Sequence, residues 1–559
     1  MRPRRLRLLF ALCVVASLVL AGRLAYWQTF GRADLSARAR DQVRSDLVVA
    51  AQRGVIRDRN GAILATTVEL RSLYALPSRI PKDDRGRVAQ QLGVLLGRDA
   101  RPIQAALDSG AEWLYVQRWL PEGTANAIAA LNIPGLGFQN EPKRLYPNDS
   151  IGAAVLGFVN DNGDGVNGVE GYYDASLRGT DGRLVVERDP ANRDLAVGLR
   201  EAIPPRNGAD LVLTIDLVAQ TAAERELAAA MKKERATSGS ILVIDPTDGS
   251  IRALASAPTY DPAAVRIADP EALRDRAIAW PYEPGSTMKA ITIAAALNER
   301  LVTPSDTYND VGYTIVGGRR LNNALGKAYG PTTVTQILER SLNAGAAWVG
   351  QKLGAQRLAD YLGRFGFGKP TGVDLGGEVS GTMRPLVEWY PVDVGTASFG
   401  QGVSASPLQL AMAYAAIANG GTLFRPYVVA SRRDADGEHR TAPVTVSHAV
   451  TPETAAAVRT MLLSTVDTGI AHNAAIAGFS VAGKTGTAQI ASPDGSYVDD
   501  LYVSSFAGFF PVDDPKYLVL VVLERPDSRL LGTVTATDAF KGVAQDILRY
   551  ARIQPDRRP

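Results

Sequence analysis

The sequence has almost no cysteine and very little histidine among its 559 residues. The single cysteine, Cys13, stands inside an apolar N-terminal run, so no disulfide can form within the chain and the rest has no cysteine nucleophile. The three histidines, His439, His448 and His472, lack paired ligand spacing, which argues against a zinc hydrolase and predicts no metal site. We expect no cofactor, and nucleophilic chemistry must use another base.

A strong charge of either sign is also missing. Lys and Arg number 61 against 58 Asp and Glu, which leaves a formal net charge of +3. Nucleic-acid binding needs clustered basic residues that neutralise phosphates, so we expect no nucleic-acid partner. The length and the 46% of hydrophobic residues predict a globular protein with two or three folded units.

An apolar run, Leu8 to Gly22, follows four arginines at the N-terminus. A helix from Leu6 to Phe30 would be about 37 Å long, enough to span a bilayer. The arginines favour a cytoplasmic N-terminus, and Tyr26 and Trp27 suit the outer interface. We therefore predict a single-pass anchor in the inner or plasma membrane; a cleaved signal peptide is the alternative, because the uninterrupted run has only 15 residues. Both interpretations place the later residues outside the cytoplasm.

A small α+β module is expected between this run and residue 205. Residues 31–50 are charged, with few helix breakers, and predict a helical stalk. An Asn60-Gly61 turn after a short strand is a strong hairpin signal. Helices are expected near residues 85–98 and 122–131.

An Asp/Asn/Gly-rich run at residues 161–168 superficially resembles a calcium loop. The pattern fails because its twelfth position is Tyr172 rather than Glu. We interpret the run as a turn-rich loop; a metal site through Asp161 and Asp164 is the weaker alternative.

The Pro/Gly-containing segment 203–208 predicts a domain boundary. Beyond it, apolar patterns separated by turn signals predict several strands and helices, including a helix capped by Asp216. Strands at both ends of this region, with helices between them, imply one mixed sheet that the chain leaves and re-enters. The predicted strands are 211–215, 240–244, 251–255 and 517–523, and a last helix is expected at 536–550.

The segment Pro284-Gly285-Ser286-Thr287-Met288-Lys289 leads into a helix-forming run. Ser286 and Lys289 stand at i and i+3, on one face of a helix. A neutral lysine there can accept the hydroxyl proton as the serine attacks a carbonyl carbon. The Ser286 N–H, at a helix start, is placed to stabilise an oxyanion. Alone, this motif is weak, because most such pairs are solvated surface.

A second motif, Ser341-Leu342-Asn343, follows a predicted helix at 332–339. The Ser341 hydroxyl can relay a proton and the Asn343 amide can hold a substrate backbone, whereas the Leu342 side chain need not face the site. Alone, such a motif is usually a cap or a turn.

A third motif, Lys484-Thr485-Gly486-Thr487, follows an apolar stretch that predicts an edge strand. Lys484 and Thr485 suit a terminal carboxylate. Gly486 would let a substrate peptide approach the backbone closely, and the Thr487 N–H is a second candidate oxyanion donor. Alone, this motif is commonly a hairpin.

In this order, the three motifs are the set found in β-lactamases and penicillin-binding proteins. With further signature stretches, the sequence resembles the class B penicillin-binding proteins, which are monofunctional D,D-transpeptidases, over nearly its whole length and is most similar to their septal branch. Those stretches include Arg53-Gly54, Arg144-Leu145-Tyr146-Pro147, Gly168-Val169-Glu170-Gly171 and Gly400-Gln401-Gly402.

The resemblance implies an α+β protein in which a transmembrane helix and an elongated α+β pedestal precede a penicillin-binding-type transpeptidase domain. The implied parts are residues 1–30 as cytoplasmic tip and anchor, 31–205 as pedestal, 206–553 as transpeptidase domain and 554–559 as tail. The implied catalytic residues are Ser286, Lys289, Ser341, Asn343 and Lys484, and the implied substrate-binding residues are Thr485, Gly486 and Thr487.

That family's activity implies that Ser286 forms an acyl-enzyme with stem peptides ending in D-Ala-D-Ala and cross-links peptidoglycan. We expect the two lysines to depress each other's pKa by like-charge repulsion, which helps keep Lys289 neutral. The implied partners are peptidoglycan stem peptides, β-lactams, a SEDS-family glycan polymerase and division proteins.

Other interpretations stay open at this point. An elongation-type transpeptidase, a D,D-carboxypeptidase or a β-lactamase would carry the same motifs. The roughly 180 residues between the anchor and the motif-bearing region argue against a secreted β-lactamase. A non-catalytic β-lactam sensor or scaffold would keep the fold, but the intact serine, lysines and asparagine weigh against it.

Overall fold

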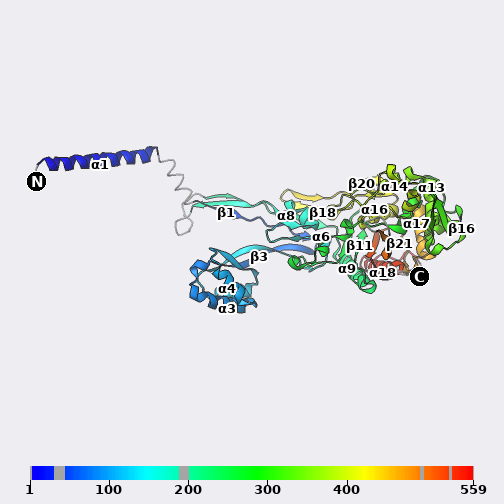
Figure 1. The fold of residues 1–559 in the computed structure, drawn as a ribbon, viewed down its shortest axis with the longest axis horizontal. Helices are drawn as coiled ribbons and strands as arrows, with labels where there is room; N and C mark the ends of the chain where they lie inside the picture. The colour runs from blue at the N-terminus through cyan, green and yellow to red at the C-terminus, as the bar shows by residue number, and fades with distance from the viewer. Residues whose placement is uncertain (1–2, 31–43, 188–199, 492–496, 528–531, 558–559) are drawn as a thin grey trace. The chain divides into compact units, whose positions relative to one another are not determined.

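The computed structural model describes the chain except for residues 1–2, 31–43, 188–199, 492–496, 528–531 and 558–559 (Figure 1). By its contacts, the chain divides into two compact units. The first contains residues 1–53 and 178–208, and the second contains residues 54–177 and 209–559.

The first unit contains the predicted N-terminal helix, α1 (Pro3–Thr29), which is long and apolar enough to cross a membrane. The helical stalk predicted at 31–50 is wrong where the structure describes it, because Arg44–Val49 forms strand β1. β1 pairs antiparallel with β8 (Gly182–Glu187), which pairs with β9 (Arg200–Ile203). This distant partner, which a local pattern cannot reveal, decides the conformation. Residues 31–43 of the predicted stalk lie outside the described residues.

In the second unit, the predicted hairpin is present as β2 (Ile56–Arg57) and β3 (Ile63–Ala75). Both predicted helices of this region are confirmed, as α3 (Arg85–Leu96) and α5 (Glu122–Ala129). An additional helix, α4 (Ala100–Asp108), is capped by the Asp99 carboxylate, which accepts a hydrogen bond from the Arg101 N–H. These helices share a small hydrophobic core with β3, β4 (Leu114–Leu120) and β5 (Leu136–Leu145).

The run at 161–168 is a turn-rich segment, as predicted, around the short hairpin of β6 (Phe158–Val159) and β7 (Gly165–Val166). Asp161 forms an ion pair with Arg266. Asp164 accepts a hydrogen bond of 3.2 Å from the Asn160 amide. Both carboxylates therefore bind protein groups in this structure.

A seven-stranded sheet joins this region to the C-terminal part of the chain. Its order is β19-β18-β10-β2-β3-β4, and β5 also pairs with β3. β10 (Asp210–Leu213) lies parallel to β2 and antiparallel to β18 (Val429–Asp434), which pairs with β19 (Gly437–Arg440). This sheet has mixed strand directions.

The site is built on a five-stranded sheet in the order β12-β11-β23-β22-β21. As predicted, the chain leaves this sheet and re-enters it, but all four strand pairs are antiparallel, so the expected mixed directions are not found here. β12 follows β11, β22 follows β21 and β23 follows β22 in the chain, and such consecutive neighbours pair antiparallel. A long segment of the chain separates β12 from β21. The strands are β11 (Ser238–Ile244), β12 (Ile251–Ala257), β21 (Ala482–Ala491), β22 (Tyr497–Phe510) and β23 (Tyr517–Glu524).

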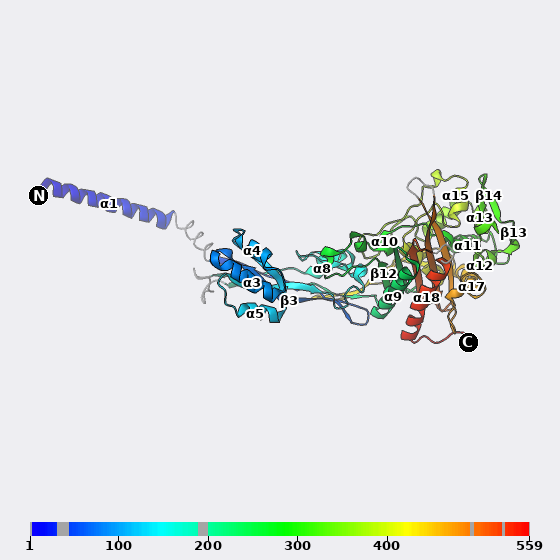
Figure 2. The same ribbon diagram turned by 60° about the horizontal axis from the view of Figure 1, so that its bottom comes forward.

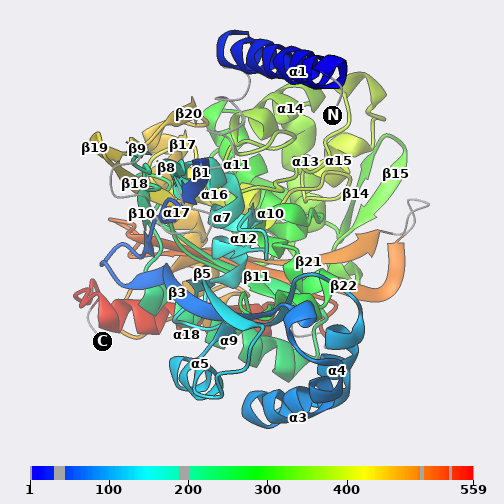
Figure 3. The same cartoon turned by 90° about the vertical axis from the view of Figure 1, so that its left-hand side faces the viewer.

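Alternating side chains of this sheet enter two separate cores. Ile241 and Val243 pack with helices α9 (Leu217–Glu234) and α18 (Gly532–Tyr550). Leu242 and Ile244 pack with α11 (Met288–Asn298) and α16 (Pro407–Ala418). Figure 2 shows α9 beside α18, and Figure 3 shows this pair on the opposite side of the sheet from α11 and α16. The cap of α9 by Asp216 is confirmed.

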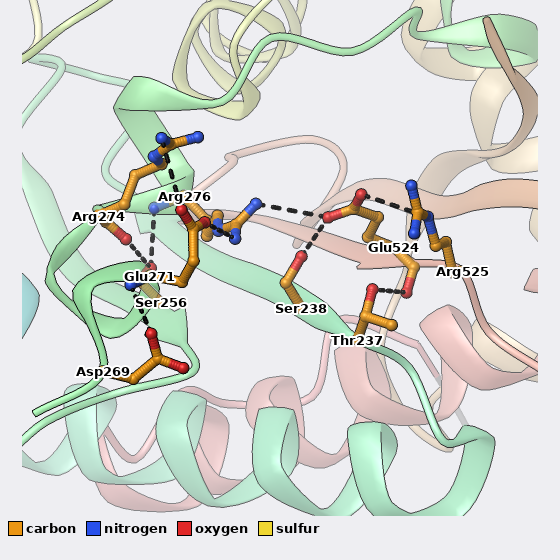
Figure 4. Close-up of polar contacts among 9 residues, drawn as sticks. All are labelled: Thr237, Ser238, Ser256, Asp269, Glu271, Arg274, Arg276, Glu524 and Arg525. Carbon is orange, nitrogen blue, oxygen red and sulfur yellow. Dashed lines mark hydrogen bonds and ion pairs between the residues drawn. The ribbon is translucent and has the colours of Figure 1, made fainter. Parts of the chain in front are cut away.

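A charged network fixes the segment that leads to Ser286 (Figure 4). The buried Arg276 guanidinium donates to Glu271 at 2.7 Å and to Glu524, at the end of β23, at 3.5 Å. Its backbone N–H donates to the Ser256 hydroxyl at the end of β12, and the Ser238 hydroxyl donates to Glu524. The segment therefore has direct polar anchors on two strands of the sheet, β12 and β23, and Ser238 of β11 holds the Glu524 carboxylate.

The remaining helices and strands lie between these elements in the chain. They are α6 (Ala153–Leu156), α7 (Gly168–Tyr172), α8 (Asp174–Arg178), α10 (Arg276–Ala279), β13 (Thr307–Asp310), β14 (Tyr313–Val316), β15 (Arg319–Asn322), β16 (Gly330–Thr333), α12 (Val334–Glu339), α13 (Asn343–Leu353), α14 (Ala355–Arg364), α15 (Asp393–Ala397), β17 (Thr422–Phe424), β20 (Thr445–His448) and α17 (Pro452–Asp467).

Candidate active site

Ser286 lies in a single 3₁₀ turn, Gly285–Thr287, that runs directly into α11. The turn needs glycine at 285, where φ is +58°, a conformation that L side chains rarely adopt. The Ser286 side chain is partly exposed, whereas Lys289, one turn later, is fully buried. The Lys289 Nζ lies 2.9 Å from the Ser286 Oγ, so the predicted pairing on one helical face is present.

The second motif lies between the end of α12 and the start of α13, and its residues contact the same lysine, Lys289. The Lys289 Nζ donates to the Ser341 carbonyl at 2.7 Å and to the Asn343 Oδ1 at 2.8 Å, and it lies 3.2 Å from the Ser341 Oγ. Ser341 adopts a φ of +56°, an uncommon conformation for a residue with a side chain. Leu342 is buried in the core, so its side chain does not face the site.

The third motif lies on β21, the edge strand that the sequence predicted. Lys484 is fully buried, and its Nζ donates to the Ser341 Oγ at 3.0 Å. The Ser341 hydroxyl therefore stands between the two lysines. Thr485 is buried and Thr487 is exposed on the same strand.

The structure gives a packing reason for glycine at position 486. A Cβ at Gly486 would lie 2.3 Å from the Ser505 Oγ and 3.0 Å from the Thr287 Cγ2. The missing side chain therefore makes room for the protein's own neighbouring strand and nucleophile turn. Strand alternation alone could not identify which neighbour fills that space. The predicted close approach of a substrate peptide to this backbone stays a prediction.

Burial controls the charge of both lysines. It lowers the pKa of Lys289 well below its ordinary value, and the nearby Lys484 charge lowers it further. Burial also lowers the pKa of Lys484 to about 7. The expected like-charge repulsion thus lowers the pKa of Lys289, but desolvation by burial is the larger cause. For Lys484, desolvation by burial accounts for the lowered pKa.

The sequence did not identify Glu283, three residues before Ser286. Its carboxylate accepts a hydrogen bond from the Gly402 N–H at 2.8 Å and another from the Tyr497 hydroxyl at 3.0 Å. Burial raises the pKa of Glu283. This residue ties the nucleophile turn to the Gly400–Gly402 segment and to the start of β22, partners that are 119 and 214 residues away.

Asn323 is a second residue that the motifs did not reveal. Its buried amide donates to both oxygens of Asp310, at 2.9 and 3.0 Å, and its Oδ1 accepts from the Ala344 N–H at the start of α13. The Asn343 amide donates to the neighbouring Asn322 carbonyl at 3.2 Å. These contacts hold Asn343 where its Oδ1 meets Lys289.

A serine hydroxyl, a buried lysine beside it and a second serine–lysine pair define a serine acyltransferase type of site on an α+β fold. Residues 239–548 match the penicillin-binding protein transpeptidase domain, and residues 48–213 match the penicillin-binding protein dimerisation domain. The chain belongs to the class B penicillin-binding proteins.

Relatives in several bacteria share almost the whole chain. Stage V sporulation protein D of Bacillus subtilis (strain 168) is 33% identical over 565 residues, which cover 99% of this chain and 86% of that protein. Peptidoglycan D,D-transpeptidase FtsI of Escherichia coli (strain K12) is 31% identical over 563 residues, 99% of this chain and 92% of that protein. The crystal structure of penicillin-binding protein 3 from Mycobacterium tuberculosis, complexed with aztreonam, matches with a TM-score of 0.72 at 27% identity, covering 91% of this chain and 98% of that one.

Proposed function

We propose that this protein is a peptidoglycan D,D-transpeptidase that cross-links stem peptides ending in D-Ala-D-Ala. The observation that carries the proposal is the 2.9 Å contact between the Ser286 Oγ and the Nζ of a buried Lys289 whose pKa is lowered. A neutral amine at that distance can take the hydroxyl proton during nucleophilic attack.

The reaction consists of two acyl transfers. Ser286 Oγ forms a bond to the penultimate D-Ala carbonyl carbon as Lys289 takes its proton, and the terminal D-Ala leaves as an amine protonated through the Ser341 hydroxyl. The amine of a second stem peptide then attacks the ester carbonyl carbon and loses a proton to Lys289. Lys289 returns that proton to the Ser286 Oγ as the bond between this oxygen and the acyl carbon breaks. Ser341, which contacts both lysines, can pass the proton between them.

The edge strand β21 supports substrate binding beside Ser286. An extended peptide can pair with an exposed sheet edge, and protonated Lys484 with Thr485 suits its terminal carboxylate. The N–H groups of Ser286 and Thr487 are the candidate oxyanion donors. Gly486 keeps β21 close to the nucleophile turn, and Asn343 orients Lys289.

The resemblance to the septal branch supports a role in cell division, and the relatives include peptidoglycan D,D-transpeptidase FtsI and stage V sporulation protein D. We infer a septal transpeptidase held in the inner or plasma membrane by α1, with its catalytic region outside the cytoplasm. A SEDS-family glycan polymerase and division proteins are the partners we propose. β-Lactams are the proposed inhibitors, and a relative's structure holds aztreonam.

Fluorescent penicillin labelling of the purified protein, with Ser286→Ala as comparison, tests the assignment. We expect stable labelling of the native chain and none of the variant, and cells that depend on Ser286→Ala should lose septal cross-linking and form filaments. Rapid release of the label would favour a β-lactamase. Full rescue of division by the variant would favour a non-catalytic sensor or scaffold, and rounded cells would favour elongation.

A further inference from the structure

A cavity of about 610 Å³ lies within the second unit, away from the three motifs. Strand β4, the β6 segment and residues 262–267 line it. Three aromatic side chains contribute to the wall: Tyr115 and Trp119 from β4, and Phe158 from β6. The volume falls within the range of small-molecule sites, and aromatic walls with a few polar groups are typical of them.

Trp119 occupies a strained position in this wall. Its φ is +55°, a conformation that is a genuine outlier for so bulky a residue. The Ser72 hydroxyl accepts its backbone N–H, and its indole N–H donates to the Pro142 carbonyl at 3.2 Å. The pairing of β3 with β4 shifts register next to it. The surrounding contacts maintain a costly conformation in a residue that lines the cavity, and such strain is common at ligand sites.

The charged groups of the cavity are already paired with each other. Arg118 donates to both carboxylate oxygens of Glu141, at 3.1 and 2.9 Å, and to the Asp161 carbonyl at 3.3 Å. The Arg266 guanidinium pairs with the Asp161 carboxylate. The Arg118 guanidinium also stacks on the Trp119 ring, 4.2 Å from its centroid. A neutral, polar ligand with an apolar face fits these groups better than an ion does.

We propose that this cavity binds the glycan strand of peptidoglycan, a chain of N-acetylated amino sugars. A pyranose ring presents C–H groups on one face, which pack against the aromatic wall of Tyr115, Trp119 and Phe158 where Arg118 does not cover it, and hydroxyl and amide groups at its edge, which reach Arg118 and Asp161. The inference rests on the proposed function, because it assigns to a second site the sugar chain that carries the stem peptides. Binding there would hold the polymer while its peptides react at Ser286.

The test is the affinity of soluble, peptide-free glycan chains whose muramic acid carboxyl groups are amidated, as in the polymer, for purified full-length protein in detergent, measured by microscale thermophoresis. Native protein should bind, and Trp119→Ala should weaken binding at least tenfold. Arg266→Ala should weaken it by about threefold, since this residue is exposed and orients Asp161. Arg235→Ala is the matched control, because both arginines are 83% exposed and each pairs with an aspartate.

No binding of the peptide-free chains by native protein, or equal binding by native protein and both cavity variants, would overturn the proposal. The melting temperature identifies any variant that fails to fold, and Arg266→Ala then remains as the decisive one. Fluorescent penicillin labelling of the same samples separates the two assignments: the proposed function predicts unchanged labelling in every cavity variant. Loss of labelling in native protein would count against the transpeptidase assignment alone.

Discussion

At the residue scale, the two buried lysines give the site a pH dependence whose direction follows from their pKa values. Lys289 must be neutral to act as a base, so acylation should fall as the pH drops through its lowered pKa. Lys484, with a pKa of about 7, must be protonated to hold a carboxylate, so acylation should also fall as the pH rises above 7. The second-order rate of penicillin acylation, measured from pH 5 to pH 10, should give a bell-shaped profile.

The variant Lys484→Arg isolates the alkaline side of that profile. Arginine keeps its proton up to about pH 12, so the decline above pH 7 should disappear while the acidic decline stays. An alkaline decline that is unchanged in this variant would contradict the role given to Lys484.

Gly400 is predicted to be needed for the position of the nucleophile. A Cβ at Gly400 would lie 2.3 Å from the Gly285 carbonyl oxygen and 2.6 Å from its nitrogen, so Gly400→Ala must displace the turn that carries Ser286. We expect penicillin acylation to fall about 100-fold, because an error of roughly 1 Å in a reacting group has that effect.

Gly420→Ala is the control for Gly400→Ala. Gly420 has a φ of +94°, close to the +83° of Gly400, but nothing lies within 4 Å of its added Cβ. The variant Gly420→Ala should be less stable than the native protein but should keep its rate of penicillin acylation. An equal loss of acylation rate in Gly400→Ala and Gly420→Ala would show that backbone strain, rather than the contact with Gly285, causes the loss.

The residues that meet at Lys289 could be predicted because each motif is local and the three are found together in one order. The roles of Glu283 and Asn323 could not be predicted, since a single carboxylate or amide in a sequence does not show which distant groups it will contact. The identity of the group beside Gly486 likewise depends on Ser505, on the neighbouring strand.

At the scale of elements, the buried Arg276 should stabilise the segment before Ser286. Arg276→Met leaves Glu524, whose side chain is 13% exposed, without its main cation, and should lower the free energy of unfolding by about 3 kcal/mol. Urea unfolding followed by tryptophan fluorescence measures this. The control Lys233→Met removes an exposed ion pair with Asp538 and should change the free energy of unfolding by less than about 1 kcal/mol. Similar losses of stability in both variants would contradict the role given to the burial of Arg276.

Elements with strong local signals were predictable, and those fixed by remote pairing were not. The cap of Asp216 and the hairpin of β11 and β12 follow from short sequence patterns. Residues 44–49 were misassigned as helix because the partner strand β8 lies more than a hundred residues later. The strand directions of the site's sheet similarly depend on which distant strands become neighbours.

At the scale of the whole molecule, α1 is predicted to be a retained anchor. Native protein should stay with the membrane after a carbonate wash, and N-terminal sequencing should find residues before position 30, since the helix is long enough to span. A chain without residues 1–30 should be soluble and still label with penicillin, but fail to restore division. A mature N-terminus just after Ala21 would indicate a cleaved signal peptide instead.

The parallel pairing of β2 with β10 has a practical consequence for dissecting this protein. A fragment that starts at residue 206 would keep β10 but lose the strand beside it, and the backbone donors and acceptors along that edge would be open to solvent. Such a fragment is a candidate for self-association through its exposed strand. Preparations meant for crystallisation or inhibitor screening should therefore begin upstream of Gly54, so that both contributors to the sheet are synthesised on one polypeptide.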